Sequence, residues 1–287
     1  MVDKVAIVTD SVACIPPELI KEYDIGVVPI QLIFGDKTYR DGVDISPTEF
    51  YVMLRQAEKL PTTAGALPGA YLETLRRASE KADNIFYITL SVKLSGVFDS
   101  AKQAIRILTD EKPSLNVELL DSEAAAAAQG LLVLAVARAA ASGKDMKELL
   151  EIARDLMPRV RLFVMVDTLE YLHRGGHVPK IASLATSLLK IKPIITLRDG
   201  EAVPITNPRT NSGAIKRIIK MMEQRVVTCK PLHVAVTHAD ALEEALFLRE
   251  QISSRFDCAE LLIMEFTPVM GAHTGPGVIG LAFYCED

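Results

Sequence analysis

The sequence lacks the features that identify two large classes of protein. It has no excess of basic residues, since 32 Lys and Arg stand against 37 Asp and Glu for a net charge of -5. A protein that binds DNA or RNA has to neutralise phosphates, so nucleic acid is not an expected partner. It also lacks a membrane span, because the longest apolar run, from Ala124, contains Gln129 and is soon followed by Arg138. Such a run is typical of a buried helix.

Metal-binding and disulfide patterns are missing as well. The four cysteines form no C-x-x-C pair, and we expect isolated, buried thiols at Cys14, Cys229, Cys258 and Cys285. No metal is expected either, because no metal-ligand spacing relates His173, His177, His233, His238 and His273. The chain begins without an apolar signal segment, and we therefore expect a cytoplasmic protein.

Cofactor and nucleophile motifs are also absent, with one partial exception. The stretch GPGVIG places Gly275, Gly277 and Gly280 in the G-x-G-x-x-G spacing of dinucleotide sites. That motif works only at the start of a helix and with an acidic residue about twenty positions later, and neither follows here. We therefore expect no cofactor, and we interpret the glycines and the proline as a rigid turn that presents His273. The P-loop, H-E-x-x-H and G-x-S-x-G patterns do not occur.

What is present is an α/β pattern that changes character near the middle of the chain. Apolar strand-like runs alternate with helical stretches through the first half, which predicts a mainly parallel sheet with flanking helices. In the second half an Asp199-Gly200 turn joins two strands, which predicts an antiparallel hairpin within a mixed sheet. We expect an N-terminal α/β domain at residues 1–158, a C-terminal α/β domain at residues 159–287 and a ligand cleft between them.

Two stretches contain candidate ligand-binding hydroxyls. A predicted strand ends at Ser91, and Ser95 and Gly96 precede a helix, where a positive helix end favours an anion. The alternative is an ordinary serine N-cap. Thr62 and Thr63 lie in a proline-flanked segment that we interpret as a loop, with simple turn chemistry as the alternative.

The remaining candidates are basic side chains near glycine or proline. His173, Arg174 and His177 surround a Gly-Gly pair that joins two predicted helices, and a basic surface cluster is the common explanation of such a pattern. Arg209 lies between the hairpin and the next helix, where an arginine is usually solvated.

Taken in order, the motifs TDS, PTT, LSVKLSG, TLEYLHRGG, PRT and GAHTGPG resemble those of the DegV family of bacterial fatty-acid-binding proteins. The resemblance covers essentially the whole chain. It implies two α/β domains that hold one long-chain fatty acid, palmitate-like or oleate-like, between them. It further implies a lipid carrier that is not an enzyme and that presents the acyl carboxylate to a separate fatty acid kinase for phospholipid synthesis.

The same resemblance implies roles for individual residues. Thr63 of PTT and Ser95 of LSG correspond to the hydroxyls that hold the carboxylate in the family, with Thr62 and Gly96 beside them. His273 of the HTGPG segment and Arg209 of PRT correspond to the polar surroundings of that head group. Departures from the family pattern occur at three places, namely Ala64, the stretch from Gly96 to Phe98, and His177.

Two other functions remain open from the residues alone. A hydrolase or transferase would use His273 as general base with Ser95 or Thr63 as nucleophile. A sugar-phosphate or nucleotide binder would use the helix end at Ser95, and it predicts a polar cleft rather than an apolar tunnel.

Overall fold

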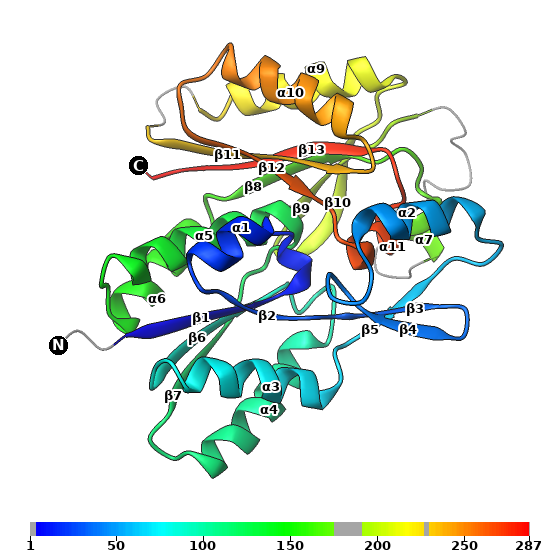
Figure 1. Cartoon of the computed structure of the whole chain (residues 1–287). Helices are drawn as coiled ribbons and strands as arrows, with labels where there is room; N and C mark the ends of the chain where they lie inside the picture. Colours follow the sequence, from blue (N-terminus) through cyan, green and yellow to red (C-terminus); the bar gives the residue numbers. More distant parts are fainter. Residues whose placement is uncertain (1–3, 175–190, 227–229, 287) are drawn as a thin grey trace.

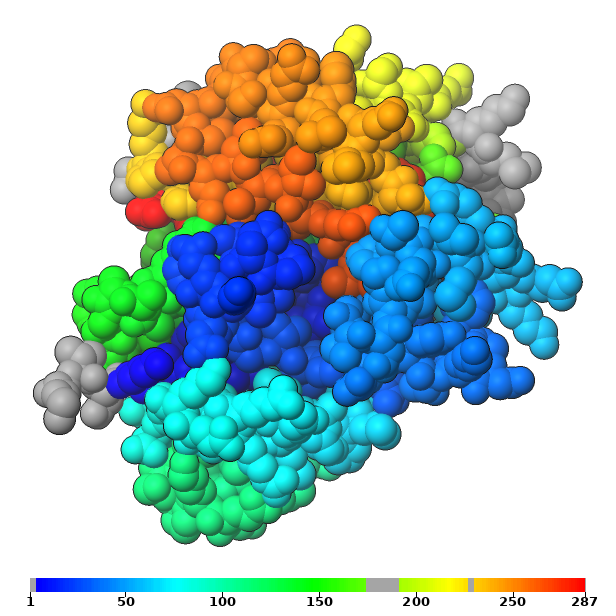
Figure 2. All heavy atoms as spheres, viewed as in Figure 1, coloured from blue at the N-terminus to red at the C-terminus, as the bar shows by residue number. Residues whose placement is uncertain are grey.

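The described part of the chain forms two large sheets with helices between and outside them, and a small third sheet beside the first (Figure 1). The computed structural model describes residues 4–174, 191–226 and 230–286. In Figure 2 the orange part of the chain, near the C-terminus, rests directly on the blue N-terminal part. The predicted fold class is confirmed: a parallel sheet forms in the first half and a mixed sheet in the second. The boundary between residues 158 and 159 stays a prediction.

The first sheet is parallel and has the order β2-β1-β6-β7. Its strands are β1 (Val5–Asp10), β2 (Gly26–Val28), β6 (Asn84–Thr89) and β7 (Asn116–Asp121). The helices of this half are η1 (Ser11–Ala13), α1 (Pro17–Glu22), α2 (Pro47–Gln56), α3 (Pro68–Ser79), α4 (Val97–Glu111), α5 (Ala126–Ala141) and α6 (Met146–Leu156). Ser46 and Glu49 form a capping box at the start of α2.

A small antiparallel sheet extends from the first half in the order β4-β3-β5. Its strands are β3 (Gln31–Phe34), β4 (Lys37–Arg40) and β5 (Thr62–Ala64). The interpretation of Thr62 and Thr63 as loop residues is therefore wrong, because β5 pairs with β3. A three-residue strand is defined by its partner more than by its own sequence pattern.

The second sheet is mixed, in the order β10-β9-β8-β13-β11-β12. Its strands are β8 (Arg161–Met165), β9 (Ile194–Arg198), β10 (Glu201–Thr206), β11 (Leu232–Ala239), β12 (Cys258–Glu265) and β13 (Val278–Cys285). The helices are α7 (Glu170–Arg174), α9 (Asn211–Glu223), α10 (Leu242–Ser253) and α11 (Pro268–Thr274). Asp199 and Gly200 have φ values of 51° and 77°, which gives the predicted hairpin turn between β9 and β10.

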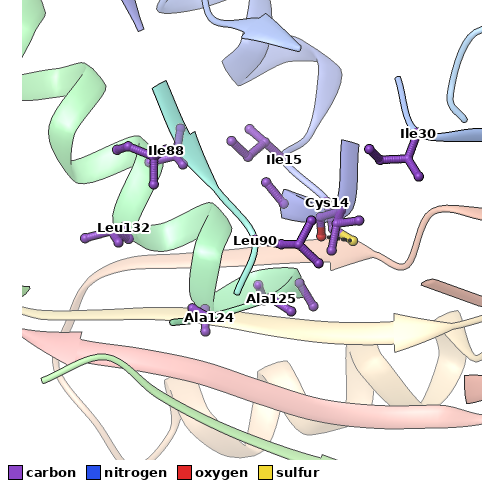
Figure 3. Packing of buried hydrophobic residues seen from close by; sticks show 14 of the residues in the cluster. Cys14, Ile15, Ile30, Ile88, Leu90, Ala124, Ala125 and Leu132 are labelled. Carbon is purple, nitrogen blue, oxygen red and sulfur yellow. Dashed lines mark hydrogen bonds between the residues drawn. The ribbon is translucent and has the colours of Figure 1, made fainter. Parts of the chain in front are cut away.

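Helix α5 lies between the two sheets and contacts β1 on one side and β11 and β13 on the other (Figure 1). Its alanines let both sheets approach closely, and nearly all of its first three turns are buried, as the apolar run predicted. A Cβ on Gly130 would stand 2.4 Å from the carbonyl oxygen of Ala13, so the backbone of α5 lies directly against the backbone of η1. Figure 3 shows Leu132 of this helix beside Ile88, and Ala125 beside Leu90 and Cys14.

The structure can be compared with the expectations about a membrane span and about the cysteines. No helix in the described part of the chain has the length and apolar character that a membrane crossing needs. The expectation of isolated, buried thiols is confirmed for Cys14. Cys258 is free but only partly buried, and Cys229 lies outside the described residues. The expectation is wrong for Cys285, which is disulfide-bonded. Disulfide formation depends on which strands lie side by side, and sequence separation does not reveal that.

The last glycine of the apparent dinucleotide motif is a packing residue. A Cβ on Gly280 would stand 2.2 Å from the carbonyl oxygen of Phe163 and 2.6 Å from the Cα of Val164, both on the neighbouring strand β8. Gly275 and Gly277 have φ values of 73° and 81°, in the region that favours glycine. The motif therefore serves a turn and a close strand contact.

We expect Gly280→Ala to destabilise the protein by about 1 to 3 kcal/mol or more, because the clash is with backbone atoms that can move only with the strand. Gly69→Ala in α3 is the matched control, since a Cβ there has nothing within 4 Å. Urea unfolding should show the loss for Gly280→Ala and no loss for Gly69→Ala. Equal stability of the two variants would contradict the close contact.

A charged network joins the two halves on the surface of α5. Arg138 of α5 forms an ion pair with Glu260 of β12, and His233 of β11 lies between Glu260, at 3.3 Å, and Glu286, at 2.8 Å. Burial alone lowers the pKa of His233, but the hydrogen bonds to the two glutamates outweigh it and raise the pKa above its ordinary value. Protonated His233 therefore stabilises the folded chain.

We expect His233→Gln to lose more stability at pH 5.5 than at pH 8.5. The stabilisation by protonated His233 is fully present below the unfolded pKa of about 6.5 and is lost as the pH rises through the higher folded value. The measurement is the difference in unfolding free energy between wild type and variant at each pH. A difference that stays constant or grows with pH would contradict the network.

Candidate functional site

An apolar cavity lies between the two halves. Most of its wall is aliphatic, with one aromatic ring from Phe266. It draws on η1, β5, α4 and α5 from the first half, and on β8, α7, β9, β10 and α11 from the second. Ile30, Leu90 and Ala125, all labelled in Figure 3, belong to this wall. The apolar character fits the tunnel that a lipid needs, and it does not fit the polar cleft expected of a sugar-phosphate or nucleotide binder.

The polar side chains of this cavity come from segments that lie far apart in the sequence. Thr63 Oγ1 and His273 Nε2 are 2.8 Å apart, a hydrogen bond that joins β5 to α11. Ser95 and Gly96 line the same cavity, ahead of α4. The structure thus brings Thr63, Ser95 and His273 to one cavity.

Thr63 faces the cavity because β5 adds to the edge of β3. Thr63 pairs with Leu32 in the antiparallel ladder. Side chains alternate along a strand, so neighbouring Thr62 points the other way. Thr62 is exposed and does not line the cavity.

Ser95 is not the N-cap of α4. Gly96 holds that position, and no side chain caps the helix. The alternative of an ordinary serine cap is therefore wrong, and Ser95 Oγ makes no hydrogen bond to any described residue. Its hydroxyl lies beside the uncapped N-terminus of a 15-residue helix, where the helix dipole favours negative charge.

His273 lies in a helix, although the sequence was interpreted as a rigid glycine turn. Pro268 is the first residue of α11, which ends at Thr274 before Gly275. The preceding strand, β12, ends at Glu265. Proline at the first helical position and glycine after the last are the signals that could have identified this helix.

Close packing fixes α11 against α2. A Cβ on Gly271 would stand 2.6 Å from the Tyr51 hydroxyl and 2.7 Å from the Phe50 ring. Buried Asp41 accepts a hydrogen bond from the Val269 N–H at 3.1 Å, and burial raises the pKa of Asp41. These contacts set the position of His273 relative to Thr63.

Asp10 of the TDS motif organises the opposite wall. Its carboxyl group accepts hydrogen bonds from the N–H of Leu90 at 2.8 Å and of Val12 at 3.2 Å, and both of those residues line the cavity. Complete burial raises the pKa of Asp10 to about 7, although the hydrogen bonds from Leu90 and Val12 lower it. This role of Asp10 was not predicted from the sequence, although its position at the end of a buried strand was an available signal.

The other candidates lie away from the cavity or outside the described part of the chain. Arg209 is exposed and does not line the cavity, so the structure does not bring it to Thr63, Ser95 and His273. Arg174 ends α7, and His173 lies one residue before it. His177 lies outside the described residues.

The arrangement suits anion binding better than nucleophilic catalysis. Thr63 and His273 have the spacing of a hydroxyl and a base, but no Asp or Glu is among the described residues that line the cavity. In the described ranges no group of three His, Cys, Asp or Glu side chains could hold a metal ion. Hydroxyl groups and helix-end N–H groups can accept a carboxylate without a buried counter-charge.

Comparison with known proteins identifies the family. A family model described as "Uncharacterised protein, DegV family" matches residues 4–286. A DegV domain-containing protein from Halalkalibacterium halodurans is 34% identical over 284 residues, which cover 99% of each chain.

Solved structures agree across the whole length. A fatty-acid-binding DegV family protein from Thermus thermophilus has a TM-score of 0.91 at 28% identity and covers 98% of this chain and 99% of its own. A stearic-acid-binding protein from Eubacterium ventriosum has a TM-score of 0.91 at 26% identity and covers 98% of both chains. The resemblance drawn from the ordered motifs is confirmed, and the chain belongs to the DegV family.

Proposed function

We propose that this chain binds a long-chain fatty acid in the interdomain cavity and serves as a lipid carrier rather than as an enzyme. The observation that supports this most directly is the combination of an aliphatic cavity with one cluster of hydroxyl and imidazole groups, at Thr63, Ser95 and His273. An amphiphile with one small polar end matches that distribution of polarity.

The acyl tail provides most of the affinity in this proposal. About 14 methylenes removed from water at about 0.8 kcal/mol each correspond to roughly 11 kcal/mol before the costs of ordering the chain are subtracted. The cavity measures about 230 Å³, whereas small-molecule pockets usually measure about 300 to 1,000 Å³. Loading of a long acyl chain therefore displaces side chains of the wall, and unbranched Met270 is suited to such a shift.

The carboxylate sets the orientation of the ligand. The Thr63 and Ser95 hydroxyls donate to its oxygens, and the uncapped N-terminus of α4 at Gly96 adds backbone N–H donors. A desolvated carboxylate needs several donors, and this arrangement supplies them from two different elements. His273 then shares its hydrogen bond to Thr63 with the head group.

The second part of the proposal concerns a partner. The family resemblance supports presentation of the bound carboxylate to a fatty acid kinase, which would place this chain in the cytoplasm, where nucleotide phosphate donors are made. His273 lies at the polar part of the cavity and is only partly buried, so it is suited to act at this step.

We expect Thr63→Val and Ser95→Ala each to weaken oleate binding by about tenfold or more, since each removes a hydrogen bond to a charged group. Thr62→Val is the matched control, because Thr62 is exposed beside Thr63 and does not line the cavity. Displacement of a fluorescent fatty acid from the delipidated protein gives the dissociation constants. Unchanged affinity in both Thr63→Val and Ser95→Ala would show that the head group binds elsewhere.

For His273→Ala we expect a folded protein that still binds oleate through the tail but supports less phosphorylation. The assay combines the carrier, a DegV-type fatty acid kinase and ATP, and it follows acyl phosphate formation at saturating oleate. Thermal unfolding of the variant checks that the fold is retained. A normal rate of acyl phosphate formation with His273→Ala would show that His273 takes no part in presentation of the carboxylate.

A further inference from the structure

A second, larger cavity lies on another side of the boundary between the halves. It measures about 570 Å³ and is bounded by α5, the end of α6, the first residues of β8, the β9-β10 hairpin and the end of α9. Four arginines from separate parts of the chain line it, namely Arg154, Arg161, Arg198 and Arg225. Its volume falls within the range of small-molecule pockets, which is about 300 to 1,000 Å³.

The cavity opens where two strands of the mixed sheet separate. Strands β8 and β9 pair only through Val164 with Ile195 and Met165 with Ile194. The ladder therefore stops before it reaches Arg161 on β8 and Arg198 on β9, and both arginines line the opening. Sheet topology thus brings together two cations that are far apart in the sequence.

Backbone and ring contacts hold two of the guanidinium groups in place. Arg161 donates from Nη1 to the carbonyl oxygens of Val160, at 3.0 Å, and of Pro158. Arg225 donates from Nη1 to the Met221 carbonyl oxygen at 2.9 Å, and its Cζ lies 5.0 Å from the centre of the Phe163 ring. In both side chains Nε and Nη2 make no hydrogen bond to a described residue, so donors remain for a ligand.

The charge of the cavity is unbalanced. Glu123 and Asp199 are its acidic residues, and neither forms an ion pair with any of the four arginines within the described ranges. Burial lowers the pKa of Arg161, and the positive charge of Arg225 lowers it further. Two like charges held close together cost free energy that a bound anion recovers.

We propose that this cavity binds a small, soluble molecule that bears a phosphate or diphosphate group. A multiply charged anion can accept hydrogen bonds from several guanidinium groups at once, whereas a single carboxylate is matched by the two parallel N–H groups of one guanidinium. Phe163, Met157 and Leu197 add apolar surface beside the arginines, which suits an organic group attached to the phosphate. The site is separate from the proposed lipid head-group site, since Thr63, Ser95 and His273 do not line it.

The two cavities share part of one wall. Leu162, Thr196 and Leu197 line both of them. A ligand in the arginine cavity therefore contacts residues that also form the wall of the apolar cavity. The phosphate site is nonetheless tested independently of fatty acid binding, because its own probe is a soluble anion.

The experiment titrates pyrophosphate, and in parallel inorganic phosphate, into the full-length protein by calorimetry at low ionic strength. Arg161→Gln and Arg225→Gln should each weaken pyrophosphate binding by about tenfold or more, since each removes charge-assisted hydrogen bonds. Arg225→Lys keeps the charge and should lose part of the affinity for pyrophosphate, because an ammonium group cannot reproduce the paired N–H donors of a guanidinium. Arg106→Gln, at an exposed position on α4, is the charge-matched control and should bind as wild type does.

Three results would overturn the proposal. One is the absence of saturable binding of either anion, and another is an equal loss of affinity in Arg106→Gln, which would indicate non-specific attraction. The third is binding only to vesicles that contain phosphatidic acid, which would assign the phosphate to a membrane surface. Oleate binding by Arg161→Gln and Arg225→Gln should match wild type; its loss in these variants, with Thr63→Val unaffected, would assign the acyl carboxylate to the arginines and overturn both proposals.

Discussion

The packing of α5 between the two sheets is the constraint on which the rest of the structure depends. Small side chains along this helix let β1 approach from one side and β11 and β13 from the other. Ala125 and Ala126, at the start of the helix, form part of the wall of the apolar cavity. The distance between the halves is therefore set by alanine and glycine side chains, and larger residues there would push the halves apart and alter the cavity.

Different elements of the fold position the polar groups of the cavity. Thr63 depends on a short edge strand, Ser95 on the segment before α4, and His273 on a helix that packs against α2. Buried carboxyl groups anchor two of these supports through backbone N–H groups, Asp41 at Val269 and Asp10 at Leu90. An amphiphile can thus be held by donors whose geometry exists before it binds, which lowers the cost of ordering the site.

The sequence predicted the local features and failed where distant segments meet. The alternation of strands and helices in the first half and the turn at Asp199-Gly200 depend on near neighbours, and both formed as expected. The strand at Thr62–Ala64 was missed because only pairing with β3 creates it, and the helix under His273 was taken for a turn. Thr63, Ser95 and His273 meet at one cavity whereas Arg209 does not, and the exposure of Arg209 agrees with the solvated position that its place between the hairpin and the next helix favours. The arginine cavity was not predicted, because its lining residues come from segments that are far apart in the sequence.

The central claim is that an acyl chain occupies the cavity between the halves. The most direct test denatures the purified protein, extracts it with organic solvent and identifies the released lipids by mass spectrometry. We predict a stoichiometric amount of long-chain fatty acid, and a rise in the melting temperature of the delipidated protein when oleate is added. An extract without fatty acid, together with an unchanged melting temperature in the presence of oleate or palmitate, would contradict the account.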